Sequence, residues 1–581
     1  MPSVMESTIN GDAQPAASKF TILEQPILTR RKLKIVCVGA GFSGLTLAHK
    51  IQHEHKLEND IYLTIYEKNA DIGGTWYENT YPGAACDIPS REQCQNRFVR
   101  QKADCRQDAY AFLFEPNPDW SKFYSPAPEI HAYIKRTAEK YNLTKNVQLN
   151  SKVLETVWDD EVGKWKIKVE INGRVEEDEA HILVNGSGFL NKWKWPKIQG
   201  LEDFKGKLVH SANWDDTYNW EGKKVAVIGN GSSGLQVVPA MEPKVAKLTN
   251  YVRGPTWISI NFCADKARDG KNFEYSEGEK KQFREDPKTH FALRKELEAS
   301  VNGFFFGMKT GHPFQQGLEA ACKQQMLDIL KNHPDMSSKM IPGFHPGCRR
   351  LSPGDGYLEA LQQKNASIVW SPIEAITEKG ILTEDRKEEE FDMIVCATGF
   401  DTSFVPPWKL VGLDGATLDE RWKVNPDAFF SVQVDSMPNY FIYNGPNAVI
   451  SHGSVLSQVS WVSDYVLRWA KKIATQDIKS ITPKSQSVAD FNEYSQEFLK
   501  RTVWADNCRS WYKNGKETGI VTGTYAGTIL HFKDVLENIG DEHFDVVSRS
   551  ENVFRWLGNG QSLHDKDGFG ELAYYMDESK I

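Results

Sequence analysis

The sequence contains two copies of a buried strand followed by a glycine-rich turn and a helix, and this repetition constrains the fold more than any other feature. In the first copy, residues 34–38 lead through Gly39-Ala-Gly41-Phe-Ser-Gly44 into an apolar helix. In the second copy, residues 224–228 lead through Gly229-Asn-Gly231-Ser-Ser-Gly234 into another helix. Glycines in such a turn let backbone N–H groups approach a pyrophosphate at the positive end of the helix. The pattern therefore predicts two dinucleotide-binding units.

The second strand of each unit ends on a charged residue, and the two charges are opposite. Residues 61–66 are followed by Glu67, whose carboxylate is placed to accept hydrogen bonds from a ribose with free hydroxyls. Residues 248–252 are followed by Arg253, whose guanidinium can pair with a 2'-phosphate. A solvated surface arginine is the alternative interpretation of Arg253. The first unit is therefore predicted to hold an unphosphorylated adenosine, as in FAD or NAD, and the second to hold NADP(H). FAD in the first and NADPH in the second is the arrangement of an α/β flavoprotein with two Rossmann-like domains.

The domain organisation follows from these two units. Residues 1–30 are polar and without periodicity, so we expect a flexible tail. The FAD-binding domain is predicted to begin with 31–205, and the NADP-binding domain to occupy 206–379. A charged, aromatic and helix-like stretch at about 259–342 predicts a helical insertion in the second domain. The remaining residues, 380–581, are expected to return to the first domain and to form a C-terminal extension.

Charge, hydropathy and cysteine spacing exclude several function classes. A net charge of -8 gives no basic field for nucleic acid. No apolar run of about 18 residues and no secretory h-region occur, so we expect neither a membrane span nor export, and a cytoplasmic location. The nine cysteines are scattered singly, without CxxC or zinc spacing. We therefore expect mostly reduced thiols, no metal site, and no disulfide-reducing activity.

Several longer motifs narrow the class further. Phe204-x-Gly206-x-x-x-His210-x-x-x-Trp214-Asp215 is one, and Gly73-Gly74-Thr75-Trp76 followed by Tyr81-Pro82-Gly83 and Asp87 is another. Gly347-Cys-Arg349-Arg350-Leu351 and Ala397-Thr-Gly-Phe-Asp401 are further matches. With these motifs the chain, from Lys32 to about Trp556, resembles the class B flavin monooxygenases and, within them, the Baeyer-Villiger monooxygenases. Cys508-Arg-Ser-Trp511-Tyr512 is similar to the family's segment that folds over cofactor and substrate.

The resemblance implies a reaction and a role for each residue. In the family, NADPH reduces FAD, O2 adds at the flavin C4a to give a peroxide, and the peroxide attacks a ketone to form an ester or lactone. Arg350 would then lie beside the peroxyflavin and the tetrahedral anion, Asp87 would position this arginine, and Arg349 would assist Arg253 at the 2'-phosphate. His210 and Trp214 are expected to have structural or hinge roles. The predicted FAD ligands are Gly39, Gly41, Gly44, Glu67, Gly74, Thr75, Trp76, Asp87 and Tyr110, and the predicted NADP ligands are Gly229, Gly231, Ser232, Ser233, Gly234, Arg253 and Arg349.

One departure from the family pattern leaves alternatives open. Family members commonly pass from CDIPS almost directly to a short Y-x-F-x-F strand, whereas here the hydrophilic residues 91–109 separate Ser90 from Tyr110. This insertion puts the geometry beside Asp87 in question. Three hypotheses remain: a Baeyer-Villiger enzyme acting with O2 on a bulky apolar ketone, an N- or S-oxygenating flavin monooxygenase, and a nucleotide-binding protein impaired in turnover by the insertion.

Overall fold

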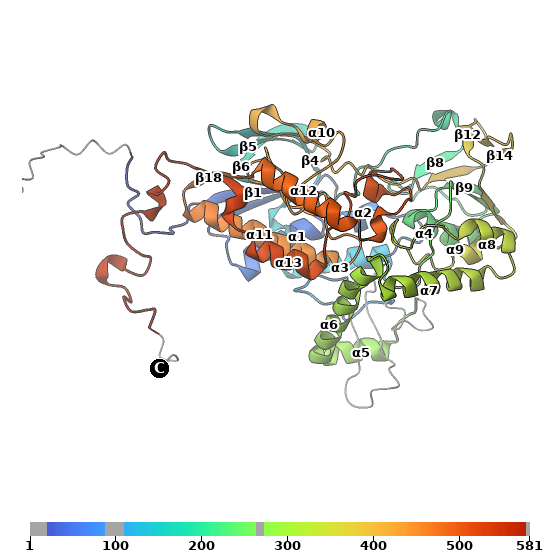
Figure 1. Cartoon of the computed structure of the whole chain (residues 1–581), viewed down its shortest axis with the longest axis horizontal. Helices are drawn as coiled ribbons and strands as arrows, with labels where there is room; N and C mark the ends of the chain where they lie inside the picture. Colours follow the sequence, from blue (N-terminus) through green and yellow to red (C-terminus); the bar gives the residue numbers. More distant parts are fainter. Residues whose placement is uncertain (1–19, 88–109, 263–271, 577–581) are drawn as a thin grey trace, which may run out of the picture.

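The computed structural model describes residues 20–87, 110–262 and 272–576 (Figure 1). The expected insertion at 91–109 and most of the expected N-terminal tail lie outside these ranges. In Figure 1 the sheet that contains β1 lies to the left, the sheet that contains β9 lies to the right, and helices α5 and α6 project below. Among the described residues, no helix is both long enough and apolar enough to cross a bilayer.

The first domain is built on a parallel sheet with the strand order β17-β7-β1-β2-β3. The strands are β1 (Leu33–Val38), β2 (Ile61–Tyr66), β3 (Val147–Gln148), β7 (Ile182–Asn185) and β17 (Tyr440–Ile442). Strands β1, β2 and β7 are almost wholly apolar, as expected where both faces of a parallel sheet are covered. Strand β17 follows the second domain in the sequence and pairs with β7, so the chain returns to the first sheet.

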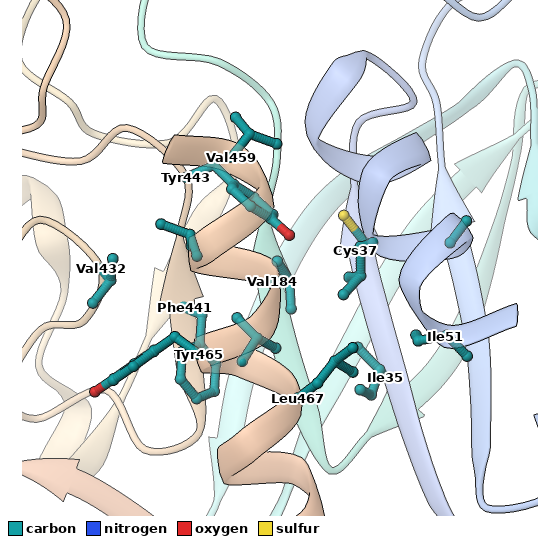
Figure 2. Close-up of a cluster of buried hydrophobic side chains, with 14 of the residues drawn as sticks. Ile35, Cys37, Ile51, Val184, Val432, Phe441, Tyr443, Val459, Tyr465 and Leu467 are labelled. Atoms are coloured by element: carbon teal, nitrogen blue, oxygen red, sulfur yellow. The ribbon is translucent and has the colours of Figure 1, made fainter. Parts of the chain in front are cut away.

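Helices cover one face of this sheet. The glycine turn leads into α1 (Phe42–His49), which packs against the long helix α11 (Val455–Thr475). Figure 2 shows Val459, Tyr465 and Leu467 of α11 in one buried cluster with side chains of β1 and β7. Further helices of this domain are α2 (Thr75–Glu78), α3 (Ala127–Lys140), α12 (Ser485–Leu499) and α13 (Ile529–Asn538).

A mixed sheet packs against the first sheet through a second apolar cluster. It has the order β16-β4-β5-β6, made of β16 (Lys409–Val411), β4 (Ser151–Asp159), β5 (Lys164–Ile171) and β6 (Arg174–Ala180). Strands β4, β5 and β6 are antiparallel, and β16 is parallel to β4. The buried Val36, Trp165, Leu183 and Trp408 join the two sheets in this cluster. A short helix α10 (Leu418–Arg421) and the antiparallel pair of β18 (Ile478–Pro483) and β19 (Phe544–Ser548) complete the region.

The second domain contains a parallel sheet with the order β11-β10-β9-β15-β8. Its strands are β8 (Lys207–His210), β9 (Lys224–Ile228), β10 (Lys247–Tyr251), β11 (Ala366–Val369) and β15 (Met393–Cys396), and α4 (Ser232–Met241) and α9 (Tyr357–Ala360) are its helices. A smaller antiparallel sheet is formed by β12 (Ile373–Ile376), β13 (Gly380–Thr383) and β14 (Glu388–Glu390). Because β15 pairs with β8 and β9, the predicted return to the first domain at residue 380 is too early, and it occurs after Cys396.

The insertion in the second domain is helical, with α5 (Glu277–Glu285), α6 (Pro287–Gly303), α7 (Pro313–Ile329) and α8 (Pro334–Met340). Helix α6 contacts the first domain at two points. Arg294 donates hydrogen bonds to backbone carbonyls, at 2.6 Å to that of Phe112, and Ser457 of α11 donates to Glu298. Residues 110–114 form turns, whereas the family pattern led us to expect a strand there.

The sequence predicted mostly reduced thiols, and the structure contains one disulfide that was not expected. Cys37, Cys322 and Cys396 are free and buried, but Cys348 and Cys508 form a disulfide across a sequence separation of 160 residues. Their spacing gives no signal of pairing because each comes from a different segment, one preceding Arg349 and the other in the C-terminal region.

Candidate functional site

The first glycine turn requires glycine for two different reasons. Gly39 has φ of +108°, and a Cβ at this residue would lie 2.6 Å from the carbonyl oxygen of Gly186. A Cβ at Gly44 would overlap the carbonyl oxygen of Gly39. At Gly41, in contrast, the nearest atom to an added Cβ is the Cα of Gly74 at 3.6 Å, which is an ordinary contact. Gly39 and Gly44 are thus needed by the turn itself, and Gly41 leaves space in front of it for a ligand.

Glu67 connects the end of β2 to this turn. Its side chain is only 4% exposed and accepts hydrogen bonds from the backbone N–H of Ala40 at 2.8 Å and of Asn69 at 3.0 Å. Burial raises the pKa of Glu67, and the two N–H donors oppose that rise. A carboxylate has about four acceptor sites, so Glu67 can also accept from a ribose hydroxyl in the adjoining cavity.

A cavity of about 500 Å³ extends from the first glycine turn to the domain interface. It brings together most of the predicted FAD-site residues and three residues predicted from other motifs. The predicted residues that line it are Gly39, Gly41, Glu67, Gly74, Thr75, Trp76, Asp87, Tyr110, Ser232, Ser233 and Arg350. The other predicted residues do not line this cavity; they are Gly44, Gly229, Gly231, Gly234, Arg253, Arg349, His210 and Trp214.

Arg350 enters the cavity among polar groups from three distant segments. Its Nη1 donates a hydrogen bond of 2.8 Å to the carbonyl of Ile450, and its guanidinium is hydrogen-bonded to the Tyr512 hydroxyl. Burial raises the pKa of Asp87, while the positive charge of Arg350 and a hydrogen bond from Gln236 oppose that rise. Gln236 Nε2 donates to Asp87 Oδ1 at 3.1 Å. The cavity therefore has a fixed guanidinium with a carboxyl group close by.

The second glycine turn repeats the geometry of the first. Gly229 has φ of +115°, and a Cβ there would overlap the carbonyl oxygen of Ala397. An added Cβ at Gly231 meets no heavy atom within 4 Å, so the space in front of the turn is open. Ser232 and Ser233 follow at the N-terminus of α4, where backbone N–H groups have no partners within the helix.

Arg253 and Arg349 lie at the side of the second turn, outside the main cavity. Arg253 follows β10 and is exposed. Arg349 Nη1 donates a hydrogen bond of 3.1 Å to the carbonyl of Pro255, and its guanidinium lies 5.0 Å from the ring centre of Phe344. Burial lowers the pKa of Arg349, and the charge of Arg253 lowers it further. The two guanidinium groups are therefore close enough to repel each other, which favours binding of an anion between them.

His210 and Trp214 occupy packed positions. The His210 ring is fully buried at 0% exposure and stacks on Trp193 with 4.8 Å between ring centres. Its Nδ1 accepts a hydrogen bond from the backbone N–H of Ala212 at 3.1 Å. Burial lowers the pKa of His210 to about 4, so the ring is neutral at neutral pH. Trp214 packs against the apolar core of the second domain. The structural or hinge roles of His210 and Trp214 stay a prediction.

Comparison with known proteins places this geometry in a family. The FAD-binding monooxygenase tazF of Aspergillus terreus is 48% identical to this chain over 580 residues, covering 99% of this chain and 100% of that protein. A Baeyer-Villiger monooxygenase of Pseudomonas aeruginosa is 33% identical over 484 residues, covering 83% and 85% respectively. Residues 32–267 match the family described as FMO-like, flavin-binding monooxygenase-like. The chain belongs to this flavin-binding monooxygenase-like family.

Solved structures confirm the fold of this flavin-binding monooxygenase-like protein. The cyclohexanone monooxygenase from Rhodococcus sp. Phi1, bound to NADP+, superposes with a TM-score of 0.73 at 23% identity, covering 90% of this chain and 100% of that one. This likeness confirms the predicted two-domain α/β fold. The two relatives confirm the predicted family and the class of FAD-dependent monooxygenase. The predicted cofactors are FAD and NADPH; the tazF relative is named as FAD-binding, and the Rhodococcus structure is that of a protein bound to NADP+.

The residues of the flavin-binding monooxygenase-like site suit a dinucleotide. Glu67 offers an acceptor for ribose, Gly41 leaves room for a pyrophosphate, and Trp76 and Tyr110 provide aromatic walls. Trp76 Nε1 donates to the Tyr110 hydroxyl at 3.2 Å, which fixes the two rings relative to each other. The chemistry of these groups therefore agrees with FAD as the occupant.

Sequence reasoning missed part of the cavity wall. Phe189 and Trp511 stack with 5.8 Å between ring centres. Other wall residues come from the insertion, from the loop before α11 and from the segment before β16. The missed lining residues include Phe189, Val301, Phe304, Trp408, Ile450 and His452. These missed residues belong to separate segments without a shared spacing, so no sequence pattern signalled them.

Proposed function

We propose that this protein is an NADPH- and O2-dependent FAD monooxygenase of the Baeyer-Villiger type, which inserts an oxygen atom beside a ketone carbonyl to give an ester or lactone. The observation that carries the proposal is the position of Arg350. Its guanidinium enters the large cavity next to Asp87, at the end where residues of both glycine-turn domains meet. A heteroatom-oxygenating enzyme of the same fold would not require a cation at this point.

The residues that hold the cofactors follow from the geometry. Gly39, Gly41 and Glu67 would bind the ADP part of FAD, and Trp76 and Tyr110 would contact its remaining part. When bound, FAD supplies the redox chemistry of the reaction by accepting a hydride from NADPH and activating O2. The protein contributes binding, orientation, electrostatics and exclusion of water.

NADPH would be bound by the second glycine turn. Gly231, Ser232 and Ser233 would face its pyrophosphate at the N-terminus of α4. Arg253 and Arg349 would pair with its 2'-phosphate, because two adjacent guanidinium groups match a phosphate dianion in charge and in hydrogen-bond donors. The domain arrangement brings Ser232 and Ser233 to the same cavity as Arg350.

Arg350 would stabilise negative charge on oxygen during the oxygenation step. The guanidinium is oriented before substrate arrives, because Ile450 accepts a hydrogen bond from it and the Tyr512 hydroxyl is bonded to it. Such preorganised donors are effective because little reorganisation is needed when the charge develops. Asp87 would limit the orientation of the guanidinium from the other side through its charge.

The substrate is proposed to be a bulky, apolar ketone. Phe262, Val301 and Phe304, from the insertion and the segment before it, line the cavity together with Val455 and Leu456 of α11. These side chains give the cavity an apolar wall away from Arg350. An apolar wall with one fixed cation suits a substrate with a large hydrocarbon part and a single carbonyl group.

The test is the variant Arg350→Ala, assayed with a panel of cyclic ketones and with a sulfide. We expect FAD content to be retained, NADPH to be consumed with release of hydrogen peroxide, and ester formation to fall by roughly a hundred- to a thousand-fold. The exposed Arg501→Ala is the matched control and should form ester at the normal rate.

Three results would contradict the proposal. Normal ester formation in Arg350→Ala would remove the role of this residue. Wild-type protein that oxygenates only the sulfide would indicate an N- or S-oxygenating enzyme. Wild-type protein that holds FAD but consumes no NADPH would indicate a nucleotide-binding protein impaired in turnover.

A further inference from the structure

A third arginine lies close to the two that are proposed to bind the 2'-phosphate. Arg509 belongs to the C-terminal region, far in sequence from Arg253 and Arg349. Burial lowers the pKa of both Arg253 and Arg349, and the charge of Arg509 contributes to the lowering of each. Arg509 is exposed, and its Nε donates to the carbonyl of Gly515 at 3.1 Å. Three guanidinium groups from three chain segments therefore share one region of the surface.

The covalent structure explains how Arg509 reaches this region. Arg349 and Arg509 each directly follow a cysteine of the disulfide, Cys348 and Cys508, whose Cα atoms are 6.4 Å apart. Arg349 in turn donates to the carbonyl of Pro255, two residues after Arg253. A continuous path of one disulfide and one hydrogen bond thus joins the three arginine-bearing segments.

The positive charge of this cluster is not compensated locally. Within the described ranges, no carboxylate forms an ion pair with Arg253, Arg349 or Arg509. The neighbouring Asp506 is paired with His345, at 2.5 Å from its Nδ1. Converging cations without carboxylate partners repel one another, and binding of a dianion removes that repulsion. The cluster therefore has the properties of a phosphate site with three ligands.

We propose that Arg509 is a third ligand of the NADPH 2'-phosphate and that the Cys348–Cys508 disulfide positions it. The inference rests on the proposed NADPH site and adds a specificity-determining residue to it. Arg253 and Arg349 approach the phosphate from the second domain, and Arg509 closes the site from the C-terminal segment. Discrimination between NADPH and NADH then depends partly on a covalent link between two distant segments.

The affinity for NADPH consequently depends on the redox state of the two cysteines. A dithiol reductant transfers two electrons and two protons to the disulfide, giving two thiols on the protein and a disulfide on the reductant. Lys513 Nζ lies 3.7 Å from Cys348 Sγ and 3.9 Å from Cys508 Sγ, so a further basic side chain packs against the disulfide. Without the link, Arg509 keeps its hydrogen bond to Gly515 and the local backbone hydrogen bonds of Cys508 and Ser510, but its covalent tie to the Arg349 segment is lost.

The experiment measures binding of 2',5'-ADP and of 5'-AMP to the FAD-loaded protein by calorimetry, so that it does not depend on turnover. The variants are Arg509→Gln, Arg253→Ala and the control Arg501→Gln, an exposed arginine in the same part of the chain. We expect Arg509→Gln to weaken 2',5'-ADP binding about five- to tenfold, as for an exposed charge-assisted hydrogen bond. Its 5'-AMP binding, and both affinities of Arg501→Gln, should match the wild type.

The disulfide is tested in the same assay. Peptide mapping after thiol alkylation should find Cys348 linked to Cys508 in protein purified without reductant. Reduction of the wild type with a phosphine, or the variant Cys508→Ser, should weaken 2',5'-ADP binding in the same direction as Arg509→Gln. The double variant Cys508→Ser/Arg509→Gln should then lose little more than either single variant, because both changes remove the same contact.

The results separate this inference from the proposed function. If the wild type binds 2',5'-ADP no better than 5'-AMP, the proposed NADPH site itself is wrong. Suppose that the wild type binds 2',5'-ADP more tightly than 5'-AMP, that Arg253→Ala loses this difference, and that Arg509→Gln binds 2',5'-ADP as tightly as the wild type. Then only the role of Arg509 is overturned. If Arg509→Gln weakens binding while reduction of the wild type does not, the positioning role of the disulfide is overturned.

Discussion

The two glycine turns of this protein have nearly the same backbone and opposite electrostatic surroundings. Gly39 and Gly229 have φ values of +108° and +115°, and each lies against a carbonyl of a neighbouring strand end. At the end of the following strand, Glu67 is buried and held by two backbone N–H groups, whereas Arg253 is exposed beside two other arginines. The turn thus provides the position for a pyrophosphate, and the residue at the strand end determines which ribose can bind.

The largest expected effect is on stability, and it concerns the glycine at positive φ that begins each turn. Gly229→Ala should destabilise the second domain by about 3 kcal/mol or more, because alanine is strained at positive φ and its Cβ would overlap the carbonyl of Ala397. Gly231→Ala is the matched control, since its Cβ meets nothing within 4 Å. It should unfold at the wild-type temperature but bind NADPH weakly. Equal thermal unfolding of the two variants would contradict the distinction.

The next effect tests the acidic side of the comparison. Glu67→Gln should weaken FAD binding by about 2 to 3 kcal/mol, because an amide cannot replace both carboxylate oxygens as acceptors for Ala40, Asn69 and a ribose. FAD content and the FAD dissociation constant are the measurements. Binding of 2',5'-ADP to the second domain should not change. A loss of both cofactors together would mean that Glu67 supports the fold as a whole and does not select the ribose.

The basic side of the comparison predicts a smaller and selective effect. Arg253→Ala should raise the KM for NADPH by an amount equivalent to about 1 to 3 kcal/mol and leave the KM for NADH almost unchanged. FAD content should stay normal. If both KM values rise equally, Arg253 does not contact the 2'-phosphate, and the contrast between the two strand ends has no functional meaning.

The smallest effect is a pH dependence of stability at a strand that links the two domains. His210, at the end of β8, has its pKa lowered to about 4 by burial, whereas in the unfolded chain it titrates near 6.5. Below about pH 6.5 the unfolded state binds a proton that the folded state does not, so stability falls as pH falls towards 4. Between pH 6.5 and 5 the loss is about 1.5 kcal/mol.

Thermal unfolding of His210→Gln and of the wild type at pH 6.5 and pH 5 tests whether stability falls on acidification because of this histidine. The variant should show less pH dependence than the wild type, and the exposed His333→Gln should show the same dependence as the wild type. A wild type that gains stability on acidification from pH 6.5 to 5, with the gain lost in His210→Gln, would mean that His210 is protonated in the folded protein.

Local features of the fold and site could be predicted from the sequence. Predicted strands at 61–66 and 224–228 agree with β2 and β9, and the glycine turns and charged strand ends lie where the pattern placed them. Apolar runs, positive φ and strand-end charges act over a few residues, so a short window contains the information. The apolar run after Asp392 was recognised as a buried strand, but the boundary at 380 was placed before it. The pairing of β15 with β8 and β9 assigns this strand to the second sheet.

The sequence alone therefore determined the two dinucleotide units, their different charges and the family of the protein. Only the tertiary structure decided that Arg350 bonds to Ile450, that Cys348 bonds to Cys508, and that α6 docks on the first domain. These contacts join segments about 100 to 180 residues apart. Their existence depends on how sheets and helices pack, and spacing along the chain carries no information about that packing because long loops close at almost the same entropic cost over a wide range of lengths.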